Sequence, residues 1–176
     1  ALPRNRKSFD VSIKSRRYWI FKPNHSYCGK FIEIYDSNQP LSSVQIDFNE
    51  FKGVVQEYIE RPLTIFGKKF DLRLYALVTS LRPLKIYLNT QGLARFCPKK
   101  YSFDNLESGC HLTNFTLHKD DPDFVFSSQS KTENAQNCKW SLRFFLSFLS
   151  VQMKTDVHKL MMQFEKIIIT TLITAI

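Results

Sequence analysis

A lysine and a glycine-lysine pair in the first thirty residues are of types that hold phosphate groups. Lys22 ends a short apolar run, and a polar loop follows it as far as Gly29 and Lys30. Phosphate oxygens bind where an ammonium group and backbone N–H groups converge, and a flexible loop can bring its amides close. The region is therefore a candidate phosphate site, although a solvated lysine at a strand end fits the same residues.

Several polar residues farther along the chain are candidates for binding a carboxylate or another ligand. Asp71 and Arg73 lie two residues apart, which places both on one face of a strand, and that face either meets solvent or lines a site. Arg95 can hold a carboxylate with two parallel hydrogen bonds. Residues 111–114, His-Leu-Thr-Asn, offer hydrogen-bonding groups but also fit a turn with an Asx cap.

Strands must position most of these residues. Short apolar runs bounded by turn residues predict strands over 18–22, 31–35 and 53–59. Apolar and other residues alternate over 70–80, which predicts one long strand with an apolar face. Residues 84–88 and 92–96 are interpreted as the two strands of a hairpin.

The apolar period changes near the C-terminus. Trp140, Phe144 and Phe148 recur every four residues and predict a helix that is buried on most faces. A second amphipathic helix is predicted from Val157 to Leu172. Residues 1–17 are expected to be loosely structured and 119–137 to form a polar surface loop. The order of elements predicts an α+β domain with an antiparallel sheet and C-terminal helices.

The composition indicates a folded, basic protein and excludes several classes of enzyme site. The chain has 176 residues, 43% of them hydrophobic, and a formal net charge of +9. Such a chain should fold, and its charge favours acidic partners or phosphates unless it only keeps the surface soluble. No Gly-x-Ser-x-Gly, Walker or His-Glu-x-x-His motif is present. The four cysteines are scattered, so we expect no zinc site and reduced thiols in the cytosol. The apolar end at residues 167–176 is far shorter than the roughly 20 residues of a membrane span, so no span is expected.

Five ordered motifs together resemble the tubulin tyrosine ligase-like family, most closely its glutamylase members. The resemblance covers nearly the whole chain. The motifs lie at residues 19–23 (Trp-Ile-Phe-Lys-Pro), 55–59 (Val-Gln-Glu-Tyr-Ile), 67–75 (Gly-Lys-Lys-Phe-Asp-Leu-Arg-Leu-Tyr), 92–96 (Gly-Leu-Ala-Arg-Phe) and 111–114 (His-Leu-Thr-Asn). Residues 138–142 (Cys-Lys-Trp-Ser-Leu) add to the likeness to glutamylases.

The resemblance implies an ATP-grasp fold and an ATP- and Mg²⁺-dependent ligase. Such a ligase phosphorylates a carboxylate of tubulin, and the amine of free glutamate, glycine or tyrosine attacks the acyl phosphate. Residues matching the family's nucleotide contacts are Lys22, Cys28, Gly29, Gln56, Glu57, Tyr58, Ile59, Lys69, Asp71, Thr113 and Asn114; those matching its amino-acid contacts are Arg95 and Lys139. The implied partner is the acidic tail of tubulin in microtubules, and the implied location is the cytoplasm and cytoskeleton, including cilia or basal bodies.

Three positions depart from the family pattern. The covering loop usually reads Gly-basic-Gly, but Phe31 replaces its second glycine and restricts φ where backbone should approach phosphate. Cys28 stands where Arg or Gln is common, so a polar contact is lost. Phe115 stands where Tyr is common, which removes a hydroxyl.

The resemblance also implies that residues 1–176 are a partial, incomplete ligase domain. The family's magnesium-binding Asp and its Glu-x-Asn pair are expected beyond Ile176, the N-terminal lobe is missing, and no metal ligand is expected in this chain. This piece alone is therefore expected to be inactive, because magnesium cannot bridge the phosphates.

Two further functions are weighed against a ligase. A non-catalytic microtubule-binding module derived from this fold is favoured by Phe31 and by the expected lack of metal ligands. A nucleic-acid-binding domain rests on net charge alone and has no recognised motif behind it, so no nucleic-acid partner is predicted. An Asp followed by Glu-x-Asn in the downstream sequence favours the enzyme over the binding module.

Overall fold

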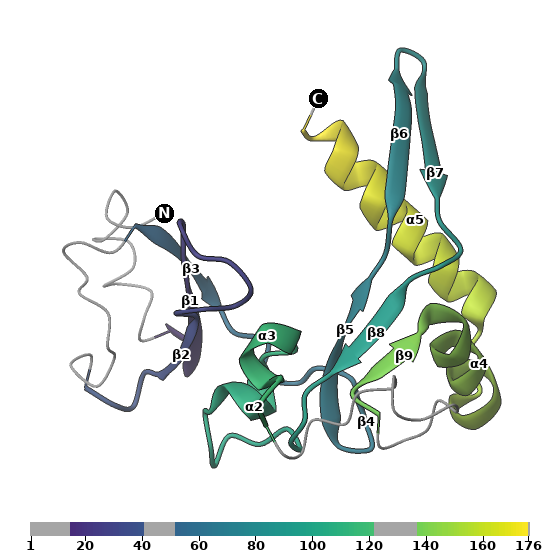
Figure 1. Cartoon of the computed structure of the whole chain (residues 1–176). Coiled ribbons are helices and arrows are strands. Elements are labelled where there is room, and N and C mark those ends of the chain that lie inside the picture. The colour runs from purple at the N-terminus through teal and green to yellow at the C-terminus, as the bar shows by residue number, and fades with distance from the viewer. Residues whose placement is uncertain (1–14, 41–51, 122–136, 176) are drawn as a thin grey trace. The chain divides into compact units, whose positions relative to one another are not determined.

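The computed structural model describes residues 15–40, 52–121 and 137–175, which belong to two compact units (Figure 1). The N-terminal unit comprises residues 1–69 and 97–124, and the C-terminal unit comprises 70–96 and 125–176. The chain passes from one to the other within strand β5 (Lys68–Arg73) and returns after strand β8 (Leu93–Phe96).

An antiparallel sheet with strand order β2-β1-β3 forms the centre of the N-terminal unit. Its strands are β1 (Tyr18–Pro23), β2 (Glu33–Asp36) and β3 (Gly53–Glu57). The three strands predicted here are confirmed, although their first or last residues differ from the prediction. Strand β2 begins later than predicted because Phe31 adopts a left-handed turn conformation, and β3 ends two residues early, before Tyr58.

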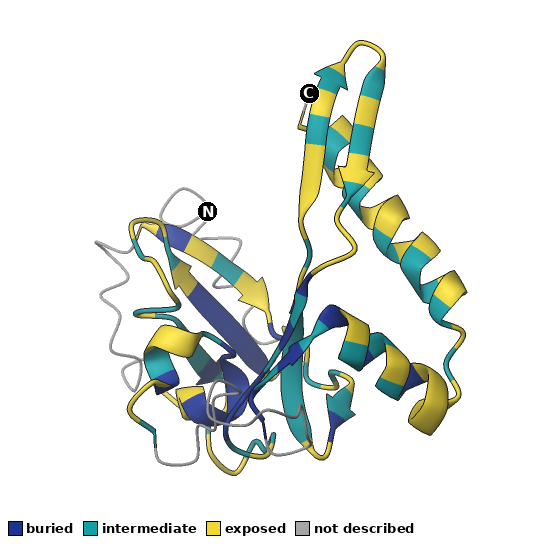
Figure 2. Ribbon diagram, turned by 45° about the vertical axis from the view of Figure 1, so that its right-hand side comes forward, coloured by how far each residue is buried: buried dark blue, intermediate teal, exposed yellow. Residues whose placement is uncertain are grey.

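Aromatic and aliphatic side chains pack beside this sheet. Tyr18, Ile20, Tyr58 and Leu112 form a buried cluster, against which Phe103 and other partly buried residues pack. Leu112 lies between two short helices, α2 (Ser108–His111) and α3 (Phe115–His118). Strand β1 is buried along most of its length because it is central in its sheet (Figure 2). Strand β4 (Thr64–Ile65) pairs with the start of β5.

Strands β5, β8 and β9 (Lys139–Ser141) pair antiparallel in the C-terminal unit, next to helix α4 (Leu142–Met153). One face of this sheet is apolar. The Phe70 ring lies 5.2 Å from Phe145 of the helix, and Trp140 lies 4.6 Å from Phe96. Burying such aromatic side chains in contact supplies much of the stability of a small core.

The prediction of one strand over 70–80 is wrong. Strand β5 ends at Arg73, and β6 (Ala76–Leu81) follows after Leu74 and Tyr75. The two strands have different partners, since β5 pairs with β8 and β6 pairs with β7 (Leu84–Leu88). Alternation along one segment does not reveal a change of partner, because both strands have the same period of two.

The predicted hairpin of residues 84–88 with 92–96 is also wrong. Strand β7 forms its hairpin with β6, around Arg82 and Pro83, whereas β8 lies between β5 and β9. The β6–β7 ribbon extends from the end of the sheet that contains β5 and β8 (Figure 1). Most of its large side chains stay at least partly exposed.

The first C-terminal helix starts later than predicted. Trp140 is in strand β9, opposite Ala94, and α4 begins at Leu142. The hydroxyl of Ser141 accepts a hydrogen bond from the Phe144 amide at 3.2 Å, so Ser141 is the N-cap. A serine cap satisfies an amide that has no partner within the helix, and it marks the start better than apolar spacing does.

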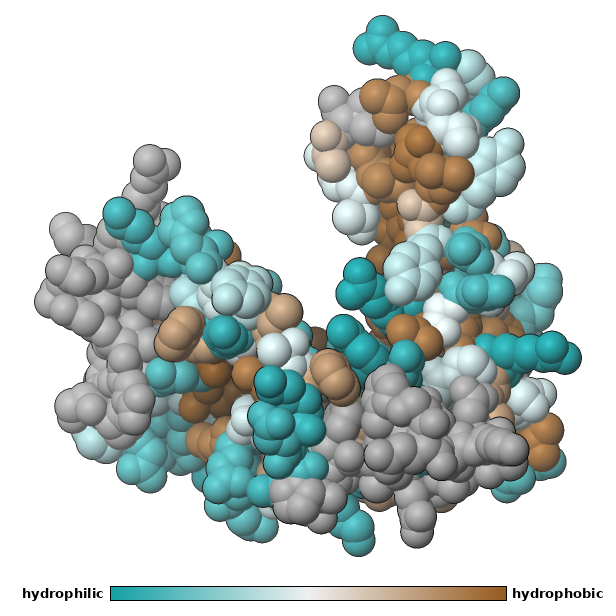
Figure 3. Space-filling model, in the orientation of Figure 1, coloured by the Kyte–Doolittle hydropathy of each residue, from teal (hydrophilic) through white to brown (hydrophobic). Residues whose placement is uncertain are grey.

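The second predicted helix is confirmed as α5 (Val157–Ile173), capped by Asp156. None of its described residues is buried. Apolar side chains gather over α5 and the β6–β7 ribbon (Figure 3). Within the described ranges no helix is long and apolar enough to cross a membrane. The predictions for residues 1–14 and 122–136 lie outside the described residues.

Together these elements make up antiparallel sheets followed by C-terminal helices, as the sequence predicts.

Candidate functional site

Two of the predicted nucleotide-binding residues contact each other at the exposed end of β1. The Lys22 ammonium donates a hydrogen bond to Oε1 of Gln56 at 2.6 Å. Strands β1 and β3 pair antiparallel, with Ile20 opposite Gln56, so Lys22 reaches this side chain from two residues away. The bond orients a cation that keeps further N–H donors for an anion.

The loop after β1 brings Gly29 against Asn114. Gly29 has a φ of +85°, and a Cβ built on it would lie 2.7 Å from Oδ1 of Asn114. Only glycine fits this close approach of backbone to side chain. Two predicted nucleotide-binding residues, 85 positions apart in the chain, therefore lie against each other.

The neighbours of Gly29 are also in the left-handed region. Cys28 and Phe31 both have a φ of 58°, and Phe31 is 78% exposed. A left-handed conformation costs a non-glycine residue about 1–2 kcal/mol. The expectation that Phe31 is unfavourable where the family has glycine is therefore matched by its backbone conformation.

The segment predicted to hold adenine lines a hollow of about 530 Å³. Glu57 in this segment forms an exposed ion pair with Arg16, at 2.9 Å. The carbonyls of Ile59 and Glu60 accept hydrogen bonds from the hydroxyl of Tyr101, at 3.4 and 2.9 Å. The lining residues are Arg16, Glu57, Tyr58, Ile59, Glu60 and Arg61.

Lys69 reaches a buried pair of aromatic residues. Its ammonium lies 2.9 Å from the hydroxyl of Tyr58, and that hydroxyl lies 2.9 Å from Nδ1 of His111. Nε2 of His111 lies 2.9 Å from the carbonyl oxygen of Asn105. Tyr58 is only 4% exposed, and burial raises the pKa of its hydroxyl. Sequence reasoning included Tyr58 and Lys69 but assigned no role to His111, although His111 opens one of the motifs.

Thr113 and Asn114 lie between the two short helices. Thr113 is buried, and Asn114 occupies the N-cap position of α3 without a capping hydrogen bond from its side chain. Its carbonyl accepts a hydrogen bond from Leu117 at 3.1 Å. The Asx cap that sequence reasoning kept as an alternative is therefore not formed, and the Asn114 side chain lies beside Gly29.

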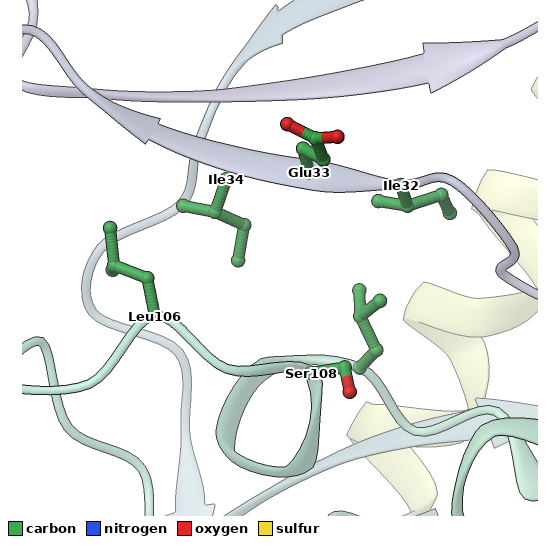
Figure 4. Close-up of a pocket in the computed structure, with 6 residues that line it drawn as sticks. Ile32, Glu33, Ile34, Leu106 and Ser108 are labelled. Carbon is green, nitrogen blue, oxygen red and sulfur yellow. The ribbon is translucent and has the colours of Figure 1, made fainter. Parts of the chain in front are cut away.

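A smaller hollow lies between β2 and the segment around α2 (Figure 4). It has a volume of about 150 Å³, and no predicted site residue lines it. Ile32 and Ile34 point into the hollow, while the Glu33 carboxylate points to the other side of the strand (Figure 4). Its lining residues are Ile32, Glu33, Ile34, Leu106, Ser108 and Leu112.

Three predicted site residues form one row across the sheet of the C-terminal unit. Asp71 on β5 lies opposite Arg95 on β8, which lies opposite Lys139 on β9. Residues directly opposite in an antiparallel sheet point to the same face, so one acid and two cations lie together there. The other face carries the aromatic side chains that pack near α4.

Asp71 and Arg95 form a bidentate ion pair. Nε and Nη2 of Arg95 donate to the two carboxylate oxygens at 2.8 and 2.6 Å. The hydrogen bonds to Asp71 raise the pKa of Arg95. Sequence reasoning assigned Asp71 to the nucleotide, but the structure pairs it with the residue assigned to the amino acid.

The same unit contains a larger hollow that sequence reasoning did not predict. Its volume is about 740 Å³, and Gly92 borders it close to Arg73, since a Cβ on Gly92 would lie 2.7 Å from the Arg73 carbonyl. The Gly92 carbonyl accepts a hydrogen bond from the Leu142 amide at 2.8 Å. The hollow is lined by Tyr75, Thr90, Gln91, Gly92, Leu93, Ser141, Leu142, Arg143 and Leu146.

In the described part of the chain, no three His, Cys, Asp or Glu side chains come together as a metal site. Cys28, Cys97, Cys110 and Cys138 do not form disulfides, and all except Cys28 are buried.

Comparison with known proteins identifies relatives along the whole chain. The model of the tubulin-tyrosine ligase family matches residues 1–176. A probable beta-tubulin polyglutamylase of Tetrahymena thermophila is 36% identical over 174 residues, which are 97% of this chain and 14% of that protein. Human tubulin polyglutamylase TTLL5 is 40% identical over 92% of this chain and 12% of its own length. Human tubulin polyglutamylase TTLL7 is 35% identical over 92% of this chain and 18% of its own length. The chain therefore spans less than a fifth of each of these relatives.

Proposed function

The chain belongs to the tubulin-tyrosine ligase family, and from this membership we propose that it is part of an ATP-dependent ligase that adds glutamate to a carboxylate side chain of tubulin. The relatives described above are named as tubulin polyglutamylases, which supports tubulin as the acceptor and glutamate as the added amino acid. Within this proposal the fold is of the ATP-grasp type, and ATP activates the acceptor carboxylate as an acyl phosphate.

The observation that carries the proposal is the charged row on β5, β8 and β9. Asp71 occupies Nε and one N–H of Nη2 on Arg95. An arginine has five N–H donors, so the end of the guanidinium still presents two parallel donors, one on each terminal nitrogen. A carboxylate of free glutamate fits that fork, and Lys139 in the same row adds a second cation.

In this proposal Asp71 orients Arg95 and does not contact the nucleotide. A carboxylate that holds one edge of a guanidinium limits its rotation and directs the other edge toward a ligand. Arg95 is thereby ready to bind before glutamate arrives, which reduces the ordering that binding requires.

The residues of the N-terminal unit suit the other substrate, ATP. Gly29 lets the backbone lie directly against Asn114, and Lys22 supplies an ammonium that retains donors. Backbone amides and ammonium groups of this kind hold the phosphates in phosphoryl transfer. We assign Lys22, Gly29, Lys69 and Asn114 to the phosphates and the segment 56–59 to adenine; Cys28 and Thr113 lie beside them in the chain.

The proposed reaction uses ATP together with Mg²⁺, which usually binds one or two carboxylates along with the phosphates. In the described ranges no three metal-binding side chains come together.

The test of the proposed function is incorporation of labelled glutamate into purified tubulin by the full-length protein. We expect incorporation that requires ATP, with glutamate preferred over glycine and tyrosine. Loss of the signal when the tubulin tails are removed is expected as well. No incorporation with any of the three amino acids, by folded full-length protein, would contradict the proposal.

One observation favours a second candidate, a module that binds microtubules without catalysis. Phe31 is exposed and left-handed where the family pattern has glycine. If this residue keeps the loop from closing over phosphates, the full-length protein binds microtubules but shows no ATP-dependent incorporation. Phe31→Gly then restores activity only if the remaining site is intact.

A further inference from the structure

A hydrogen-bonded chain runs from the Lys69 ammonium to the backbone of residue 105, and its direction follows from the chemistry of its members. An ammonium group can only donate, so Lys69 donates to the Tyr58 oxygen. The Tyr58 hydroxyl then uses its single proton to donate to Nδ1 of His111. A carbonyl can only accept, so Nε2–H of His111 donates to Asn105. Every donor and acceptor along this chain is satisfied when His111 is neutral.

We propose that His111 is a positioning residue that acts through Tyr58 to hold the Lys69 ammonium where it binds the nucleotide phosphates. This inference rests on the proposed function, because the phosphate role of Lys69 belongs to it. Without an acceptor at Nδ1, the Tyr58 proton turns to the other neighbouring group, the Tyr101 hydroxyl, and the Tyr58 oxygen no longer points the same lone pair at Lys69. A buried network of this kind specifies one geometry when all of its members are paired.

The surroundings of His111 keep it neutral. Its ring contacts Tyr58, Tyr101 and Phe103, with centroids 5.6, 5.0 and 5.6 Å away. The charged and titratable groups near this pair are the Lys69 ammonium, the Tyr101 hydroxyl and the Cys97 thiol. Burial lowers the pKa of His111, and the Lys69 charge lowers it further.

Protonation of His111 breaks the chain. Both ring nitrogens of a charged histidine are donors, so Nδ1–H and the Lys69 ammonium would compete for the same Tyr58 oxygen. The Tyr58 proton would lose its acceptor, and two positive charges would approach each other. The positioning role therefore predicts that the Michaelis constant for ATP rises as the pH falls toward the lowered pKa of His111, which lies below the ordinary value of about 6.5.

The experiment measures Lys69 directly in the full-length protein. The rate at which an amine-selective reagent labels Lys69 is followed by mass spectrometry without ATP, and steady-state kinetics are measured in parallel. Tyr58→Phe removes only the hydroxyl, and His111→Leu removes the acceptor. His111→Asn restores an acceptor near the position of Nδ1. His118→Asn is the matched control, since His118 is also buried but hydrogen-bonds to the Leu112 carbonyl, at 2.7 Å.

We expect Tyr58→Phe and His111→Leu to raise the labelling rate and the Michaelis constant for ATP about fivefold each, the effect of losing one hydrogen bond. His111→Asn should recover most of this change, and His118→Asn should leave Lys69 labelling unaltered. In folded Tyr58→Phe protein, unchanged labelling or an unchanged Michaelis constant for ATP would overturn the inference. The labelling needs no ATP, so a protein that fails to use ATP contradicts the proposed function, while the labelling rates still test whether His111 positions Lys69.

Discussion

At the scale of single residues, Arg95 is the sharpest test of the amino-acid site. Arg95→Ala removes the carboxylate fork, and a charge-assisted hydrogen bond contributes about 1.5–3 kcal/mol. The Michaelis constant for glutamate should therefore rise roughly ten- to a hundredfold, with a smaller change for ATP. Kinetics with each substrate varied separately measure this difference.

Two further variants separate substrate binding from a purely structural ion pair. Arg95→Lys keeps the charge but loses the fork, and it should bind glutamate nearly as poorly as Arg95→Ala. Asp71→Asn keeps a hydrogen-bond acceptor and should weaken glutamate binding less. If Arg95→Ala lowers the melting temperature and affects both substrates equally, Arg95 supports the fold only.

The neutral state of His111 makes a second prediction at this scale. Its pKa in the folded protein is lowered from 6.5, so the unfolded chain binds more protons than the folded one as the pH falls below that value. The contribution of neutral His111 to the free energy of unfolding is therefore fully present above about pH 6.5, and it declines as the pH falls toward the pKa of the folded protein. Melting curves of wild-type and His111→Asn protein between pH 8 and pH 5 measure it. The melting temperature of the variant should fall less than that of the wild type over this pH range. Identical pH profiles would contradict a buried neutral His111.

At the scale of elements, the loop between β1 and β2 depends on Gly29. Gly29→Ala places a Cβ 2.7 Å from Asn114 and holds alanine at a φ of +85°. We expect a destabilisation of about 1–2 kcal/mol and weaker ATP binding. Gly109→Ala is the control, because its Cβ would meet only the flexible Lys99 side chain, at 3.3 Å. Calorimetric melting with and without ATP compares the two, and equal effects would show that Gly29 has no special role.

The start of α4 can be tested in a similar way. Ser141→Ala removes the hydroxyl that accepts from the Phe144 amide and should destabilise the protein by about 1 kcal/mol. Ser147 lies on the exposed side of the same helix, so Ser147→Ala should have almost no effect. Denaturant unfolding monitored by circular dichroism gives both values. A helix that begins at Trp140 or earlier would show no difference between these two variants.

At the scale of the whole molecule, the net charge of +9 predicts electrostatic attraction to acidic tubulin tails. The Debye length falls from about 10 Å at 0.1 M salt to about 3 Å at 1 M, so binding between exposed charges should weaken over that range. Co-sedimentation with microtubules at increasing salt measures this, with tail-cleaved microtubules as the control. Binding that resists both treatments would point to an apolar interface instead.

The sequence by itself determined the family, the antiparallel strands around Lys22 and Gln56, and the helix from Val157, and it named the candidate site residues. These features depend on the spacing of apolar residues within a segment and on the order of the motifs, and both can be read directly from the sequence. Only the tertiary structure decided that residues 70–80 are two strands, that β7 pairs with β6, and that Trp140 belongs to a strand. It also decided that Asp71 pairs with Arg95 and that His111 lies behind Tyr58 and Lys69. The physical reason is that strand pairing and side-chain hydrogen bonds join residues far apart in the chain, and local spacing contains no information about which partner a strand or a charge will meet.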